Sequence, residues 1–131
     1  MKKKIIIAEQ NAPYRKVLKQ LLGSSYEVHE AVTEEQLHLI LAVKPDVIIY
    51  DLYFSEGDFK DSMDKILKIS PLSHVLVQGF EDRDNTLIPE FCISQGAKGY
   101  LDKGIADINV LIDAIERITK GETVIELDRT I

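Results

Sequence analysis

Five polar side chains follow the apolar runs of this sequence and could share one site. Asp51 is the most informative, because a carboxylate that ends an apolar run must lie at the rim of its strand, near a cation or with a shifted pKa. Two carboxylates, two amides and one ammonium group form a constellation of mixed sign, a kind that can hold a charged group. The five residues are Glu9, Gln10, Asp51, Gln78 and Lys103.

Each of these residues also has a simpler structural explanation. Asp51 can begin a loop or cap a helix, and Lys103 can be a solvated loop lysine. Glu9 and Gln10 can form a plain strand-to-helix turn, and Gln78 can hydrogen-bond to backbone. Residue types and spacing leave both explanations open.

An alternation of short apolar runs and helical periodicity, repeated five times, supplies the elements that would position these residues. The runs at 5–8, 47–50 and 75–77 are continuously apolar, as in parallel strands buried on both faces. Residues 26–31 and 99–101 predict two further strands, with Tyr100 as an edge-strand aromatic that packs on the last helix. Helical patterns follow each strand. They run from Pro13 to Gly23, from a Thr33/Gln36 capping box to Pro45, over 65–70, and over 108–118 before Gly121.

The segment 81–94 breaks this regularity, because Pro89 falls where an uninterrupted helix would run. We expect a long loop and a short helix there. The whole pattern predicts an α/β, flavodoxin-like (βα)5 fold, a doubly wound sheet of five parallel strands in the order 2-1-3-4-5. In such sheets, sites form beyond the carboxyl ends of the strands, where the strand order reverses.

The size, charge and cysteine content of the chain restrict the functions that it could have. The 131 residues fit one domain over 1–131, with a core at about 3–121 and a short tail at 122–131. A net charge of −6 disfavours direct binding to nucleic acid or to an anionic membrane. The apolar run after Lys2–Lys4 is too short for a signal peptide or a membrane span. The single Cys92 fits a reducing, cytoplasmic location.

Along essentially its whole length, the sequence resembles the receiver domains of two-component response regulators. Residues 44–51 (KPDVIIYD) are similar to the run that leads to the family's phosphoacceptor aspartate. Residues 96–103 (GAKGYLDK) are similar to the segment that holds the family's invariant lysine. Residues 106–121 resemble the last helix of receivers that precede LuxR/NarL-type DNA-binding domains.

This resemblance implies roles for individual residues. Asp51 would accept a phosphoryl group from a histidine kinase or a small phosphodonor, and a weak Mg²⁺ site on Glu9 and Asp51 would neutralise its charge. Lys103 would pair with phosphoryl oxygens, and Tyr100 would rotate inward when the site switches. The implied metal pocket comprises Glu9, Gln10, Asp51 and Tyr53, and the implied switch residues are Gln78, Tyr100 and Lys103.

The sequence departs from the family pattern at the positions that matter most for this chemistry. Glu9 and Gln10 stand where the family usually has two aspartates, so the usual three carboxylates fall to two. Gln78 stands where the family has a hydroxyl residue, and its longer side chain could instead occupy the space beside Asp51. Mg²⁺ affinity and switching are therefore expected to be atypical.

Three hypotheses about function remain. In the first hypothesis, the chain is a receiver that is phosphorylated on Asp51. Phosphorylation then remodels its fourth helix, fifth strand and fifth helix for an output domain, a partner protein or a second copy. Alternatively, it is a phosphorylation-independent pseudo-receiver, an interaction or dimerisation module held in one state by Gln10 and Gln78. An enzyme of this fold is the third hypothesis, but no nucleophile–base pair or glycine-rich phosphate loop supports it.

Overall fold

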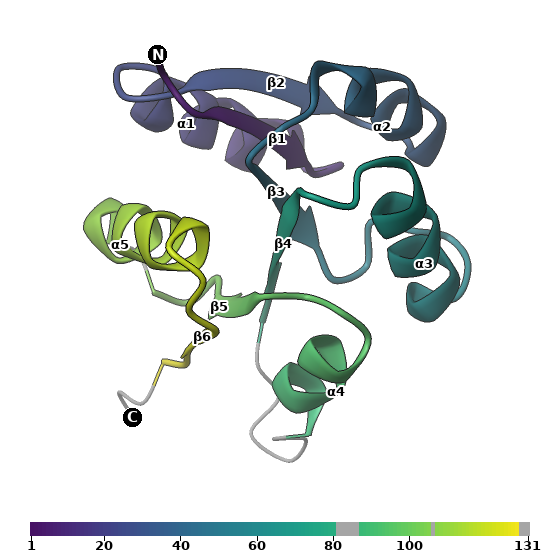
Figure 1. Cartoon of the computed structure of the whole chain (residues 1–131). Coiled ribbons are helices and arrows are strands. Elements are labelled where there is room, and N and C mark those ends of the chain that lie inside the picture. The colour runs from purple at the N-terminus through teal and green to yellow at the C-terminus, as the bar shows by residue number, and fades with distance from the viewer. Residues whose placement is uncertain (81–86, 106, 129–131) are drawn as a thin grey trace.

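The fold is one parallel sheet between two layers of helices (Figure 1). The computed structural model describes residues 1–80, 87–105 and 107–128. All strand pairs are parallel, in the order β2-β1-β3-β4-β5-β6. The elements are β1 (Lys4–Ala8), α1 (Ala12–Leu22), β2 (Glu27–Ala31), α2 (Glu34–Ile40), a 3-10 turn (Leu41–Val43), β3 (Val47–Asp51), α3 (Phe59–Ile69), β4 (His74–Gly79), α4 (Ile88–Ser94), β5 (Gly99–Asp102), α5 (Ile108–Thr119) and β6 (Val124–Glu126).

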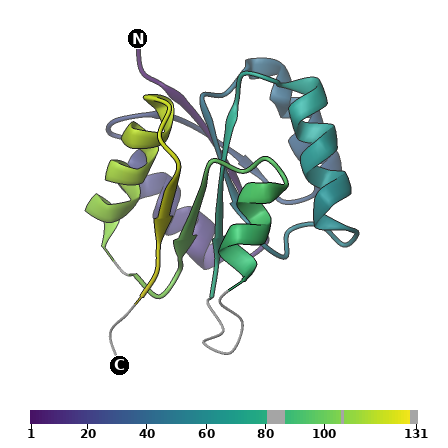
Figure 2. The same cartoon turned by 60° about the horizontal axis from the view of Figure 1, so that its bottom comes forward.

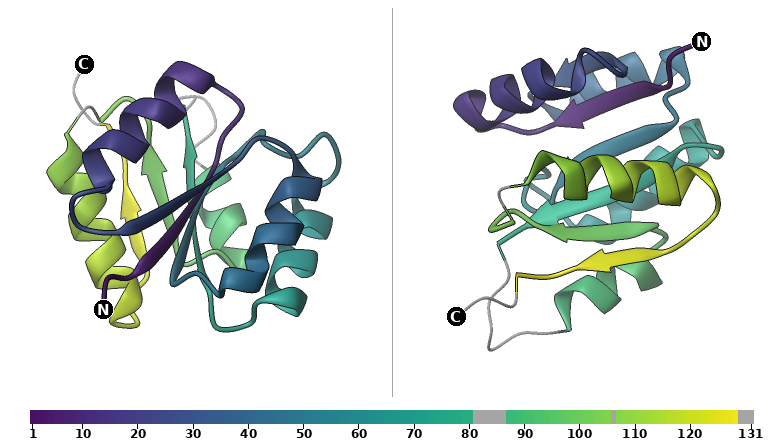
Figure 3. Two further views of the ribbon diagram at one scale, coloured as in Figure 1. Left: turned by 90° about the horizontal axis from the view of Figure 1, so that it is seen from above. Right: turned by 90° about the vertical axis from the view of Figure 1, so that its left-hand side faces the viewer.

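The helices divide between the two faces of the sheet, as Figure 3 shows from two sides. Helices α1 and α5 cover one face, and helices α2, α3 and α4 cover the other. Each face has its own apolar core, because alternate residues of the central strands point in opposite directions. The continuous apolar runs of β1, β3 and β4 are buried on both faces, and the predicted flavodoxin-like, doubly wound fold is confirmed.

Local signals determine where the helices begin and end. The Thr33 hydroxyl accepts a hydrogen bond from Gln36 N at 3.1 Å, and Gln36 Oε1 accepts one from Val32 N at 2.9 Å. The predicted cap of α2 is therefore present, although its reciprocal bond reaches one residue further back. Helix α4 is short and has Pro89 in its first turn, as predicted, while residues 81–86 of the expected loop lie outside the described residues. Within the described part of the chain, no helix is long and apolar enough to cross a bilayer.

A sixth strand, β6, forms in the segment that the sequence analysis treats as a tail (Figure 2). It runs parallel to β5, with Gly99, Tyr100 and Leu101 opposite Val124, Ile125 and Glu126. Arg117 of α5 holds it through ion pairs to Glu122 at 3.2 Å and to Glu126 at 3.5 Å. The run of two apolar residues is too short to indicate a strand by itself. The open edge of β5 supplies the pairing partner, so the sheet has six strands rather than five.

Candidate functional site

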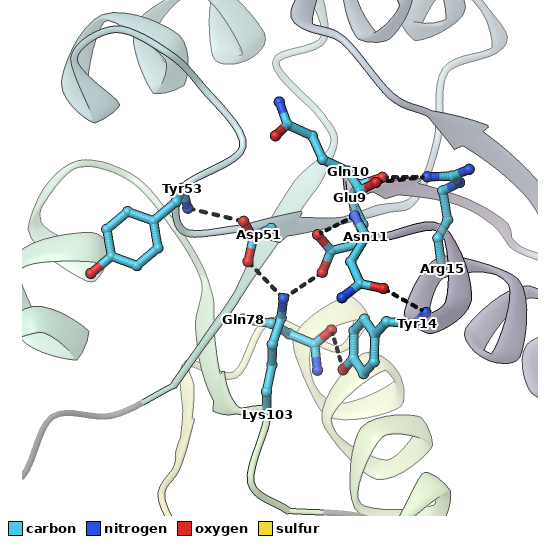
Figure 4. Close-up of polar contacts among 9 residues, drawn as sticks. All are labelled: Glu9, Gln10, Asn11, Tyr14, Arg15, Asp51, Tyr53, Gln78 and Lys103. Atoms are coloured by element: carbon cyan, nitrogen blue, oxygen red, sulfur yellow. Dashed lines mark hydrogen bonds and ion pairs between the residues drawn. The ribbon is translucent and has the colours of Figure 1, made fainter.

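The carboxyl ends of β1, β3, β4 and β5 meet at one edge of the sheet, and Figure 4 shows the polar side chains that they carry there. Glu9 follows β1, Asp51 ends β3, Gln78 lies opposite Asp51 on β4, and Lys103 follows β5. These four predicted residues come together. The edge is that of the predicted site, because parallel strands all end on the same side.

Lys103 lies at the centre of the site. Its ammonium group forms an ion pair with Asp51 Oδ1 at 2.7 Å and another with Glu9 Oε1, and the three side chains are at most 15% exposed. Burial alone would lower the pKa of Lys103, but hydrogen bonds to Asp51 and Glu9 outweigh this effect and raise the pKa above its ordinary value. The ammonium group also lies 4.8 Å from the centre of the Tyr14 ring, a cation–π contact.

Asp51 is held through both of its carboxylate oxygens. Oδ1 binds Lys103, and Oδ2 accepts a hydrogen bond from Tyr53 N at 3.2 Å. Tyr53 thus contributes its backbone, since its side chain is 72% exposed. The two contacts aim the carboxylate toward Lys103, and its side chain stays 15% exposed to solvent.

The two glutamines that distinguish this site from the family pattern make different contacts. Gln10 Nε2 donates to Phe54 O at 3.2 Å, so the Gln10 amide is directed away from the acidic pair (Figure 4). Gln78 is 3% exposed, and its Oε1 accepts a hydrogen bond from the Tyr14 hydroxyl at 3.2 Å. Burial raises the pKa of Tyr14, so this phenol keeps its proton at neutral pH.

Sequence reasoning missed two residues of α1, Tyr14 and Arg15. Tyr14 binds Gln78 and lies against Lys103. Arg15 is buried, donates to Glu9 O at 2.8 Å and pairs with Glu30 of β2 at 3.2 Å, which ties the loop after β1 to the neighbouring strand. One sequence signal could have indicated both residues, namely the start of the helix just after Gln10. Side chains in the first turn of that helix lie close to the edge of the sheet.

Tyr100, a predicted switch residue, is fully buried. Its ring belongs to the core on the α2–α4 face, so the expectation that it packs on the last helix is wrong. β5 is also not an edge strand, because β6 covers it. Successive side chains of β5 point to opposite faces of the sheet, and Leu101 is the one that points to the α5 face. Tyr100 therefore points to the other face. A Cβ at Gly79 would lie 2.7 Å from the Tyr100 hydroxyl, so the absence of a side chain at Gly79 makes room for this packing.

We expect Gly79→Ala to destabilise the protein by about 1–3 kcal/mol, because the added methyl group overpacks the contact with Tyr100. The free energy of unfolding in urea measures this effect. Gly57→Ala is the matched control, since the nearest atom to its added methyl group would be 3.7 Å away. Equal stability of the two variants would contradict the tight packing of Tyr100 against Gly79.

Two carboxylates, those of Glu9 and Asp51, converge at the predicted metal pocket, and both contact Lys103. Residues 1–80, 87–105 and 107–128 contain no group of three or more acidic, histidine or cysteine side chains arranged to hold a metal. Mg²⁺ often binds through one or two carboxylates together with water and a substrate phosphate. The donor set therefore fits a weak Mg²⁺ site that a phosphoryl group would complete.

Comparison with known proteins gives relatives along nearly the whole chain, although no protein-family model matches it. The transcriptional regulatory protein YvfU of Bacillus subtilis is 30% identical over an alignment of 135 positions, which covers 97% of this chain and 64% of that protein. The chemotaxis protein CheY of Thermotoga maritima is 26% identical over 123 residues, which cover 92% of this chain and 100% of that protein. The chain thus spans less than two thirds of YvfU.

Solved structures share the fold. A LuxR-family two-component response regulator from Aurantimonas sp. superposes with a TM-score of 0.79 at 20% identity, covering 95% of this chain and 89% of that one. A response regulator from Burkholderia pseudomallei, solved with a phosphorylated aspartic acid, calcium ion and citrate, superposes with a TM-score of 0.72 at 19% identity, covering 92% and 69%. The chain is thus similar in sequence to these two regulators, and it shares the fold of solved response-regulator structures.

Proposed function

We propose that this chain is a response-regulator receiver domain that accepts a phosphoryl group on Asp51 and passes the resulting change to a partner or output domain. The observation that carries this proposal is the pairing of Asp51 with Lys103 at 2.7 Å at the carboxyl end of the sheet. The carboxylate is a nucleophile, and the ammonium group beside it is the cation that a transferred phosphoryl group requires. The Burkholderia response regulator, solved with a phosphorylated aspartic acid, provides a structural parallel.

In the proposed reaction, one Asp51 oxygen attacks the phosphorus atom of a phosphohistidine or of acetyl phosphate. An acyl phosphate forms, and the bond to the donor's histidine nitrogen or acetate oxygen breaks, so that the donor leaves. The Lys103 ammonium group then leaves the Asp51 oxygen and pairs with a phosphoryl oxygen. Mg²⁺ held by Glu9 and Asp51 would neutralise part of the developing charge. Its binding would be weak, because only two protein carboxylates would hold it.

Incubation with acetyl phosphate and Mg²⁺, followed by intact mass measurement, tests this proposal. We expect one labile phosphoryl group to be added to the wild type and none to Asp51→Asn, whose amide oxygen is a poor nucleophile. Asp46→Asn is the matched control, since Asp46 lies before β3 at the opposite end of the strand from Asp51. No addition at saturating donor and metal, or equal addition to Asp51→Asn, would overturn it.

The Tyr14–Gln78 hydrogen bond favours a second candidate function, that of a pseudo-receiver. In the family scheme, a hydroxyl residue at the Gln78 position moves toward the phosphoryl group and the aromatic residue rotates inward. Here the Gln78 carbonyl accepts a hydrogen bond from Tyr14, and the Tyr100 side chain is already buried. A domain held in this single state would act as an interaction or dimerisation module whose signal is the amount of its partner.

The double variant Gln10→Asp and Gln78→Thr tests whether these two glutamines limit phosphorylation of Asp51. We expect it to gain phosphorylation, about tenfold or more in rate, because it adds a third carboxylate and replaces the Gln78 amide, which is bound to Tyr14, by the hydroxyl of the family pattern. The rate of mass gain with acetyl phosphate measures this change. Gln95→Asp and Gln20→Thr, made together at positions away from the site, control for general effects. An unchanged rate would show that these two glutamines do not limit the chemistry.

We propose that α4, β5 and α5 carry the output contacts to a partner protein, an output domain or a second copy, and that the domain works in the cytoplasm. The relatives support a signalling role, since YvfU is named as a transcriptional regulatory protein and CheY as a chemotaxis protein. A histidine kinase would supply the phosphoryl group. Strand β6 lies on the edge of β5, so it belongs to this output surface as well.

A further inference from the structure

A pocket opens between α1 and α5 and shares Tyr14, Gln78 and Lys103 with the site. Its volume is about 230 Å³. Apolar side chains of both helices form most of its walls, and four residues add polar groups. The lining residues are Tyr14, Val17, Leu18, Leu21, Gln78, Leu101, Lys103, Ile105, Asp107, Ile108 and Leu111.

Gln78 gives this pocket an unused hydrogen-bond donor. The residue is 97% buried, because its exposed fraction is 3%, and its Oε1 is bound by Tyr14. Among the residues that the structure describes, none accepts a hydrogen bond from Gln78 Nε2, and Gln78 lines the pocket. Nε2 is not among the described buried side-chain atoms that lack a partner, so it meets the open space of the pocket. A polar group in a mostly apolar pocket fixes the orientation of a ligand, so a ligand that supplies an acceptor there is favoured.

The charges around the pocket determine which ligands suit it. Lys103 is the lining cation, but Glu9 and Asp51 already bind its ammonium group. Asp107 adds a further carboxylate at the rim. The net charge is therefore negative, which disfavours an anionic ligand. Apolar walls favour a ring or a short branched chain, and a volume of about 230 Å³ limits it to a small molecule.

We propose that this pocket binds a small uncharged molecule with an apolar ring and one carbonyl oxygen, the carbonyl accepting the hydrogen bond from Gln78 Nε2. Binding would also affect the site around Asp51. Gln78 lies opposite Asp51 in the β3–β4 strand pairing, and its side chain binds Tyr14, which lies against Lys103. The pocket itself does not depend on phosphoryl transfer. Asp51→Asn should keep it intact, so this inference and the proposed function can fail separately.

Benzamide is the probe, because it has a ring, a carbonyl oxygen and no charge. In a titration followed by ¹H–¹⁵N NMR, we expect saturable shifts of the Gln78 side-chain amide and of pocket residues on α1 and α5, with a dissociation constant of about 1 mM. Toluene lacks the acceptor and benzoate carries a charge, so both should bind at least about fivefold more weakly. Tighter binding of benzoate, or shifts that do not saturate or that map elsewhere, would overturn the proposal.

Two variants test the position of the ligand. Val17→Phe fills the pocket from its half-exposed rim and should weaken benzamide binding by about tenfold or more. Leu39→Phe, an exposed substitution on α2 across the sheet, should leave binding unchanged. Gln78→Leu should abolish the preference for benzamide over toluene, because it removes the donor. Binding that resists Val17→Phe, or a preference that survives Gln78→Leu, would place the ligand elsewhere.

Discussion

Replacing Val124 by aspartate is expected to lower the free energy of unfolding by about 3–4 kcal/mol. Val124 is 2% exposed and belongs to the core that α5 forms against the sheet. The substitution loses the burial of an apolar side chain and places a carboxylate in this apolar core. Urea denaturation followed by far-UV circular dichroism measures the change.

Ile125→Asp is the matched control for this prediction. Ile125 is the next residue of β6, but it points outward and is 41% exposed, so the same carboxylate there stays in water. We expect it to cost less than about 1 kcal/mol. If Val124→Asp were no more harmful than Ile125→Asp, β6 would be a loosely attached segment and the sheet would effectively end at β5.

Lys103→Met is expected to destabilise the protein by about 2–3 kcal/mol at pH 7. Methionine keeps the apolar stem but removes the ammonium group that pairs with Glu9 and Asp51. Two neighbouring carboxylates, each at most 15% exposed, are then left without their cation, and removing one partner from such a buried pair is costly. The midpoint of urea unfolding reports the loss.

The pH dependence of this loss follows from the raised pKa of Lys103. A folded-state pKa above the unfolded value means that the ion pairs stabilise the fold fully below about pH 10.4, and that this contribution is lost as the pH rises through the folded pKa. The difference between wild type and Lys103→Met should therefore stay constant from pH 7 to about pH 9 and shrink at higher pH.

Lys60→Met controls for the loss of a surface charge. Lys60 pairs with Asp64 at 3.5 Å, but both side chains are more than half exposed, so water screens the pair and little stability depends on it. A Lys103→Met variant as stable as Lys60→Met would contradict the central role of Lys103 in the site. A difference that grew above pH 10 would contradict the direction of its pKa shift.

The architecture followed from local patterns in the sequence. Continuous β-branched runs at residues 5–8 and 47–50 indicate strands covered on both faces, and helical stripes between them require a parallel sheet with crossovers. Thr33 and Pro89 marked one helix start and one shortened helix correctly. β6 escaped prediction because three residues carry too little pattern, and their pairing depends on an edge 25 residues earlier in the chain.

The sequence by itself determined which residues reach the site edge, because parallel strands end together: Glu9, Asp51, Gln78 and Lys103 follow from strand positions alone. The tertiary structure decided what those residues do to one another. Lys103 and Glu9 are 94 positions apart, and Tyr14 and Gln78 are 64 apart, so no local pattern encodes either contact. Gln10 turned away to Phe54 for the same reason, since packing across elements determines side-chain direction once the backbone has determined position.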